Sequence, residues 1–112
     1  MKNAVQAVVV YDGRLLLIRE ADGWGLPSGV GQPAETAQAT AARVVYETTG
    51  YLADGSPALD GTAAVPCQLL SEDPSDGARL GPEDIRWTPV EQTAAIALPA
   101  AVRDYLAGHT PV

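Results

Sequence analysis

The sequence contains a single cysteine, Cys67. One thiol cannot form an intramolecular disulfide framework, and it cannot supply a cysteine-based metal site. The lack of disulfides fits a reducing compartment such as the cytosol. Both a disulfide-stapled secreted domain and a cysteine-rich metal domain are therefore excluded.

Positive charge is scarce as well. Seven Lys and Arg residues stand against fourteen Asp and Glu, which gives a formal net charge of −7 at pH 7. Phosphate backbones and anionic membranes are bound by clustered Lys and Arg, whereas the basic residues here are scattered singly. The composition therefore argues against a nucleic-acid polymer and against a membrane as partner.

Long apolar runs are also missing. No segment approaches the length of a membrane span. The run from Met1 to Tyr11 is too short, and too interrupted by Gln6, to be a secretory signal. We therefore expect a cytoplasmic protein. Its 112 residues, 46% of them hydrophobic and without a low-complexity tract, predict a single domain over residues 1–112.

The apolar pattern predicts strands alternating with helices. Two β-rich runs, residues 4–10 and 15–18, flank the tight-turn pair Asp12-Gly13 and predict a hairpin. Residues 34–49 have a helical pattern that ends at Gly50, a residue suited to a left-handed C-cap, so that Glu35 falls in the first helical turn. The remaining elements predicted are loops at 23–33, 53–61 and 71–81, strands at 62–70 and 84–88, and a closing helix at 100–107. This order indicates an α/β fold with a mixed sheet between helices.

The residues of greatest chemical interest lie between Gly23 and Tyr51. The spacing of five of them resembles the box that defines the Nudix hydrolase (MutT-like) family: Gly29, Glu35, Arg43, Glu47 and Gly50. The box is degenerate, because Val44 and Thr48 stand where the family has glutamates. Its flanks agree with the family over nearly the whole chain, through Trp24, Leu26 and Pro27 before the box and through residues 83–87 and 98–99 near the end.

The resemblance implies the Nudix-type α/β/α sandwich and hydrolysis of nucleoside diphosphate derivatives with Mg²⁺ or Mn²⁺. Such metals prefer carboxylate ligands, and positions 44, 47 and 48 share one face of a helix. Carried over residue by residue, the resemblance assigns catalytic or supporting roles to Glu47, Arg43 and Glu35. It assigns metal binding to Glu47, the Gly29 backbone and Glu83, and substrate binding to Gly29, Trp24 and Tyr51.

Each assignment has a structural alternative. Glu35, Arg43 and Glu47 could form an ordinary surface ion-pair network. Gly29 could permit a turn, and Trp24 could be a packing residue. Tyr51 could stack on a nucleobase or fill the hydrophobic position that closes the box. Three acidic residues of the 71–81 loop could replace the missing glutamates, as loops of the family do: Glu72, Asp73 and Asp76.

Three functions are consistent with this sequence. The first is a Nudix-fold protein that binds a nucleotide-like small molecule and whose hydrolysis is weak or lost. The second is an active, metal-dependent pyrophosphohydrolase that uses a compensating acidic residue. The third is a protein-interaction scaffold, and a homodimer is left open. Because one box carboxylate of three remains, we favour the first.

Overall fold

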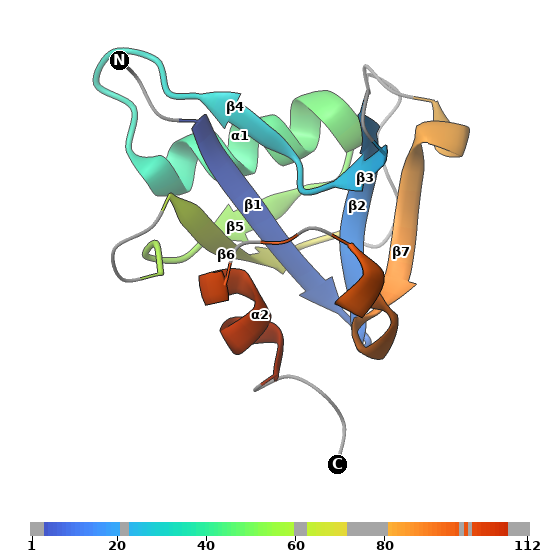
Figure 1. The fold of residues 1–112 in the computed structure, drawn as a ribbon. Coiled ribbons are helices and arrows are strands. Elements are labelled where there is room, and N and C mark those ends of the chain that lie inside the picture. Colours follow the sequence, from blue (N-terminus) through green and yellow to red (C-terminus); the bar gives the residue numbers. More distant parts are fainter. Residues whose placement is uncertain are drawn as a thin grey trace.

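The protein was analysed as a computed structural model, which describes residues 4–20, 23–59, 63–71, 81–96, 98 and 100–107. Within these residues, seven strands form a mixed sheet that two α-helices cover (Figure 1). The strands are β1 (Ala4–Tyr11), β2 (Arg14–Glu20), β3 (Gly23–Gly25), β4 (Ser28–Val30), β5 (Ala53–Gly55), β6 (Ala64–Leu69) and β7 (Ile85–Pro89). The helices are α1 (Ala37–Thr49) and α2 (Ala100–Ala107), with 3-10 turns η1 (Pro82–Asp84) and η2 (Val90–Ala95).

Strand β1 is the centre of the sheet. It runs parallel to β6 and antiparallel to β2 and β4, while β2 also pairs with β3 and β7. The described register joins β1 to β2 only at the hairpin end, through Val10 opposite Leu15 and Tyr11 opposite Arg14. Beyond these pairs the two strands diverge (Figure 1), and β4 pairs with the opposite end of β1.

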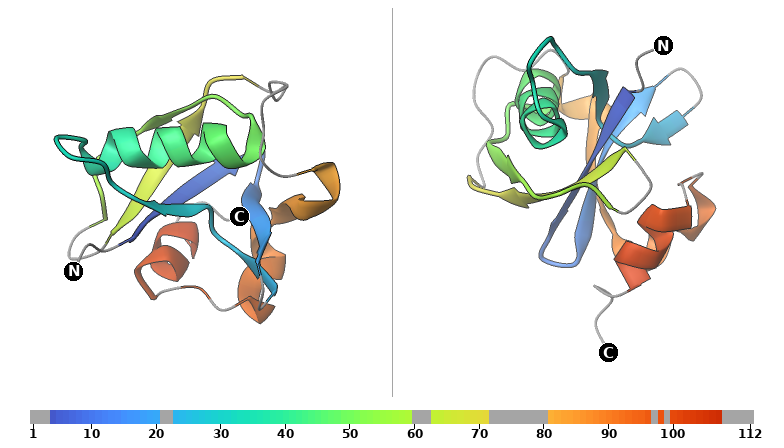
Figure 2. Two further views of the ribbon diagram at one scale, coloured as in Figure 1. Left: turned by 90° about the horizontal axis from the view of Figure 1, so that it is seen from above. Right: turned by 90° about the vertical axis from the view of Figure 1, so that its left-hand side faces the viewer.

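The sheet lies between α1 and α2, as the α/β/α sandwich predicts (Figure 2), and a hydrophobic cluster covers each of its faces. Side chains alternate along each strand, so Val9 and Leu16 pack toward α1, whereas Val8 and Leu17 pack toward α2. Cys67 belongs to the α1 side, where burial raises the pKa of its thiol to about 11. No helix among the described residues is long and apolar enough to cross a membrane.

The locally encoded elements are confirmed. The hairpin turns at Asp12 and Gly13, which have φ values of 53° and 73°. Helix α1 ends at Gly50 in the left-handed conformation, with φ 80°, and the Gly50 amide donates to the carbonyl of Tyr46. The strand around Trp87 and the closing helix also occur where the pattern places them.

The start of α1 and three short strands were predicted wrongly. The helix begins at Ala37 because the Thr36 side chain accepts a hydrogen bond from the Ala39 amide, which is an N-cap. Ala34, with φ 65°, and Glu35 precede the helix, so Glu35 is not in its first turn. The segments expected as loops at 23–33 and 53–61 contain β3, β4 and β5, three residues each, which pair with β2, β1 and β6.

Candidate functional site

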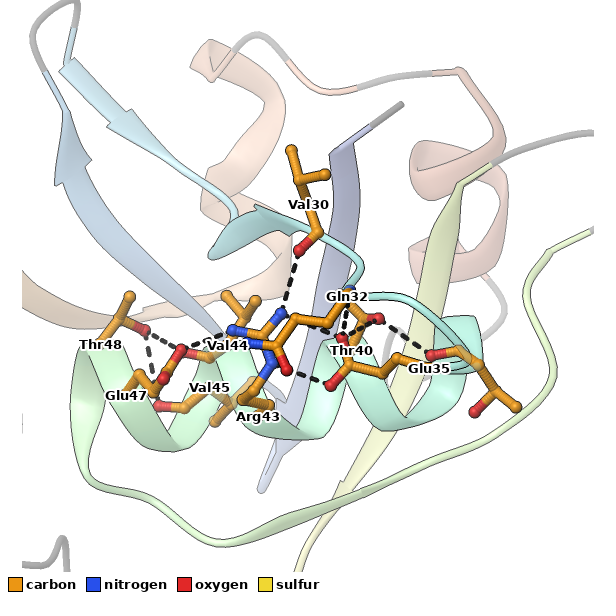
Figure 3. A network of polar contacts seen from close by, with 10 residues as sticks. Val30, Gln32, Glu35, Thr40, Arg43, Val44, Val45, Glu47 and Thr48 are labelled. Carbon is orange, nitrogen blue, oxygen red and sulfur yellow. Dashed lines mark hydrogen bonds and ion pairs between the residues drawn. The ribbon is translucent and has the colours of Figure 1, made fainter. Parts of the chain in front are cut away.

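Arg43 is the centre of a polar network along the exposed side of α1 (Figure 3). Its Nε donates to Glu35 Oε2 at 2.9 Å, and its Nη2 lies 3.0 Å from both Glu35 Oε1 and the carbonyl oxygen of Val30. The two hydrogen bonds to Glu35 form a bidentate pair. One guanidinium group therefore ties the end of β4 to the segment before α1 and to the helix itself.

Glu35 is held in place by more than Arg43. The Gln32 amide donates to Glu35 Oε1 at 3.0 Å, and the Thr40 hydroxyl lies 2.7 Å from the same oxygen. These hydrogen bonds lower the pKa of Glu35 to about 2. The bond from Arg43 has the largest effect, followed by those from Gln32 and Thr40. The same pairing raises the pKa of Arg43. Glu35 is therefore a structural anion that closes the 32–36 turn.

Glu47 lies on the solvent side of α1. Its side chain is 56% exposed, and its Oε1 accepts a hydrogen bond of 2.7 Å from Arg43 Nη1. Glu35, Arg43 and Glu47 are thus joined by ion pairs. An exposed pair four residues apart on a helix stabilises it by only a few tenths of a kcal/mol.

Val44, which stands where the resemblance implies a first glutamate, is buried against β4. A Cβ atom added to Gly29 would lie 2.7 Å from Val44 Cγ2, closer than non-bonded carbon atoms approach. Gly29 does not have a positive φ. Its lack of a side chain is needed for this close approach of β4 to α1, and the Val44 methyl group fills the space above the Gly29 backbone.

Thr48 stands where the resemblance implies a second glutamate. Its side chain is buried, and its hydroxyl donates to the Val44 carbonyl at 2.6 Å (Figure 3). Val44 and Thr48 therefore share one buried face of α1, while the Glu47 carboxylate is directed to Arg43 on the exposed side.

The described residues on this face of α1 do not fit a divalent metal such as the resemblance implies. Mg²⁺ and Mn²⁺ need several hard oxygen ligands, yet this face of α1 offers a valine and an internally bonded threonine. Among the residues that the structure describes, no three His, Cys, Asp or Glu side chains form a group that could hold a metal ion. Glu83 is exposed on η1 and takes no part in the Arg43 network. Glu72, Asp73 and Asp76 lie outside the described residues.

Trp24 lies on the α2 side of the sheet, close to two guanidinium groups. The Cζ atoms of Arg19 and Arg86 are each 5.6 Å from its ring centroid, a distance typical of cation–π contacts. Both guanidinium groups belong to exposed residues, and Arg19 forms a long ion pair of 3.9 Å with Asp84. Trp24 thus holds two cations together on the surface of an otherwise acidic protein.

The sequence alone did not point to Arg19 or Arg86. Strand alternation could have placed Arg19 on the same face as Leu17, because it follows two residues later on β2. Arg86 required the register between β2 and β7, which sets it opposite Leu17. That register joins segments almost seventy positions apart in the chain and has no local signal.

Tyr51 and Trp24 were both expected to bind substrate, but the structure places them on opposite faces of the sheet. Trp24 packs against the α2-side core and Tyr51 against the α1-side core. The Tyr51 hydroxyl oxygen accepts a hydrogen bond from Trp87 Nε1 at 3.1 Å. The two aromatic residues therefore do not contribute to one binding surface.

Comparisons with known proteins agree with this architecture. The model of the NUDIX domain family matches residues 1–107. A NUDIX hydrolase from Nitrosomonas europaea superposes with a TM-score of 0.70 at 22% identity, covering 99% of this chain and 93% of the other. An ADP-ribose pyrophosphatase from Streptococcus suis superposes with a TM-score of 0.64 at 16% identity, covering 95% of this chain and 84% of the other.

A third solved structure, a MutT protein from Bacillus halodurans, gives a TM-score of 0.65 at 17% identity, covering 96% of this chain and 80% of the other. At these identities the likeness concerns the fold. No curated protein matches the sequence.

Proposed function

This chain belongs to the NUDIX domain family, hydrolases of nucleoside diphosphate derivatives, and from that premise we propose that it binds a nucleotide-like small molecule while its hydrolysis is weak or lost. The observation that carries the proposal is the buried face of α1. There Val44 packs on Gly29 and the Thr48 hydroxyl donates to its own helix, so two of the three box carboxylates are replaced by an apolar group and by a neutral hydroxyl, which is at best a weak metal ligand.

The proposed ligand contacts are on the opposite side of the sheet. Arg19 and Arg86, held by Trp24, offer two guanidinium groups, which suit the oxygens of a diphosphate because Arg binds phosphate groups in a bidentate manner. Since both cations already contact the ring, Trp24 acts as a positioning residue. The proposed ligand is a small molecule and not a nucleic acid, since the net charge of −7 opposes a polyanion. We place the protein in the cytoplasm.

The remaining box residues receive structural roles in this proposal. Arg43 and Glu35 fix the segment that connects β4 to α1, and Glu47 adds an exposed ion pair. Gly29 permits the contact with Val44. No reaction step is assigned to these residues, because a water would have to be activated by a metal that the described side chains do not hold.

The test is a thermal-shift panel of nucleotides, ADP-ribose and nucleotide sugars, each with and without Mg²⁺ or Mn²⁺. A ligand at about one hundred times its Kd adds roughly 2.7 kcal/mol of stability. We expect a shift that does not need metal, that is lost in Arg19→Gln plus Arg86→Gln, and that persists in the matched control Arg14→Gln. Product formation is followed in parallel by ³¹P NMR.

The other two functions correspond to different results of the same panel. Metal-dependent release of a phosphomonoester at an ordinary enzymatic rate would overturn the proposal and establish the active hydrolase with a compensating acidic residue. If no compound shifts the melting temperature and no product forms, nucleotide binding is refuted and the scaffold becomes the leading function.

A further inference from the structure

A separate cavity of about 250 Å³ lies beside the turn that joins β1 to β2. It is lined by Tyr11, Asp12, Arg14, Tyr51, Leu69 and Trp87. Tyr51, Leu69 and Trp87 pack on the α1 side. Tyr11 and Arg14 share that face, because they follow the alternation of Val9 and Leu16. Helix α1 ends at Gly50, so its C-terminus forms one border of the cavity.

This cavity is distinct from the residues proposed to bind a nucleotide. Trp24 packs against the core on the α2 side, so the sheet lies between it and the cavity. The Arg43 network contributes none of the six lining residues. Ligands at the two places can therefore be distinguished by mutation.

The aromatic wall of the cavity has a fixed geometry. The Tyr51 and Trp87 rings are 5.5 Å apart and meet at 82°, and Tyr11 meets Trp87 at 6.4 Å and 64°. The hydrogen bond from Trp87 Nε1 to the Tyr51 hydroxyl fixes both rings. Together with Leu69 these rings form a preorganised apolar surface, so little conformational entropy is lost when a ligand binds.

The rim carries two opposite charges on one tight turn. Asp12 and Arg14 are exposed, and within the described part of the chain neither side chain forms an ion pair or a side-chain hydrogen bond. Asp12 is held in the left-handed region and Arg14 begins β2, so the backbone that carries both is rigid. The cavity thus offers one carboxylate and one guanidinium group beside an aromatic wall.

From these features we propose that the cavity binds a small zwitterion with an apolar body, such as an amino acid with an apolar side chain. Its ammonium group pairs with the Asp12 carboxylate, its carboxylate with the Arg14 guanidinium, and its apolar part with Trp87, Tyr51 and Leu69. The volume is below the range of about 300–1,000 Å³ typical of sites for drug-sized ligands. A nucleotide is disfavoured because Asp12 would repel its phosphate.

Binding is tested by calorimetry on the full chain with three matched probes. L-Phenylalanine carries both charges, phenethylamine lacks the carboxylate, and 3-phenylpropionate lacks the ammonium group. Betaine and L-leucine then separate the need for an aromatic body from the need for a zwitterion. We expect the amino acids to bind and each single-charge analogue to bind at least ten times more weakly.

Two variants and one control assign the contacts. Asp12→Asn retains the turn, because Asn tolerates a positive φ. It should weaken amino-acid binding about tenfold while leaving the affinity for 3-phenylpropionate unchanged. Arg14→Gln should also weaken amino-acid binding about tenfold while leaving the affinity for phenethylamine unchanged. Arg19→Gln, on the other face, should have no effect. In ¹⁵N NMR, the indole N–H of Trp87 should shift on binding while that of Trp24 stays in place.

Clear results would overturn the assignment. These are the absence of saturable binding by every zwitterion, equal binding of all three phenyl probes, or amino-acid binding that survives both rim variants. Displacement of the amino acid by ADP-ribose in the wild type, but not in Arg14→Gln, would assign the cavity to nucleotides and refute the zwitterion. The first three results do not bear on the Arg19 and Arg86 contacts, so this inference and the proposed function can fail separately.

Discussion

At the scale of single residues, the contact between Gly29 and Val44 is the most consequential. Val44 is β-branched and buried, so it cannot move aside for a new atom. We expect Gly29→Ala to destabilise the protein by about 1–3 kcal/mol, the usual cost of overpacking. In a Val44→Ala background the same change should cost much less. Urea denaturation of the wild type, the two single variants and the double variant measures this coupling. Strictly additive changes in the free energy of unfolding would contradict the contact.

Glu35 gives a second prediction at this scale. Its folded-state pKa, about 2, is below the usual value of 4.5. A carboxylate with a depressed pKa contributes stability above the unfolded pKa and loses it as the pH falls through the folded pKa. We therefore expect Glu35→Gln to be less stable than the wild type at pH 6, and the difference to narrow between pH 4.5 and 2. A difference that is independent of pH in urea titrations would refute the role of ionised Glu35.

At the scale of elements, the two ends of α1 are defined by their caps. Gly50 has φ 80°, where a side chain is strained. We expect Gly50→Ala to cost on the order of 1 kcal/mol. Glu47→Gln, which removes only an exposed ion pair, should change stability by less than about 0.5 kcal/mol. Equilibrium denaturation giving the reverse order would mean that the Arg43 network, and not the cap, holds this end of the helix.

The buried face of α1 gives another test. Val44→Glu combined with Thr48→Glu puts two carboxylates on the buried face of α1, and we expect the apo protein to lose several kcal/mol because buried charges lack partners. Addition of Mn²⁺ or Mg²⁺ should reverse part of the resulting fall in melting temperature. The control is Val44→Gln plus Thr48→Gln, which has the same shape without charge and should not respond to metal. A double mutant equally insensitive to metal would show that positions 44 and 48 do not reach a common site.

At the scale of the whole molecule, the sheet separates two surfaces of different chemistry. The α2 side carries Arg19 and Arg86 around Trp24, and the α1 side carries the cavity beside Tyr51. We expect the two ligand classes to bind independently, so that saturating L-phenylalanine changes the Kd of ADP-ribose by less than about twofold. Competition calorimetry measures this, and a coupling of tenfold or more would contradict two separate sites.

The amino-acid sequence by itself determined the features that depend on neighbouring residues. Asp12-Gly13 specified the hairpin turn, because these residues tolerate a positive φ, and Gly50 specified the end of α1 for the same reason. The spacing of Gly29, Glu35, Arg43, Glu47 and Gly50 indicated the family, and with it the layered fold. It also identified the two missing carboxylates at positions 44 and 48.

Only the tertiary structure decided the features that depend on distant partners. The three-residue strands β3, β4 and β5 have too little local preference to be seen in the sequence, and they exist because β2, β1 and β6 supply their hydrogen bonds. The register of β2 and β7 brings Arg86 to Trp24, and the packing of α1 on β4 buries Val44 and leaves Glu47 on the surface. Helical spacing alone could not tell which of these side chains would face the sheet, because that depends on how the whole helix is rotated against it.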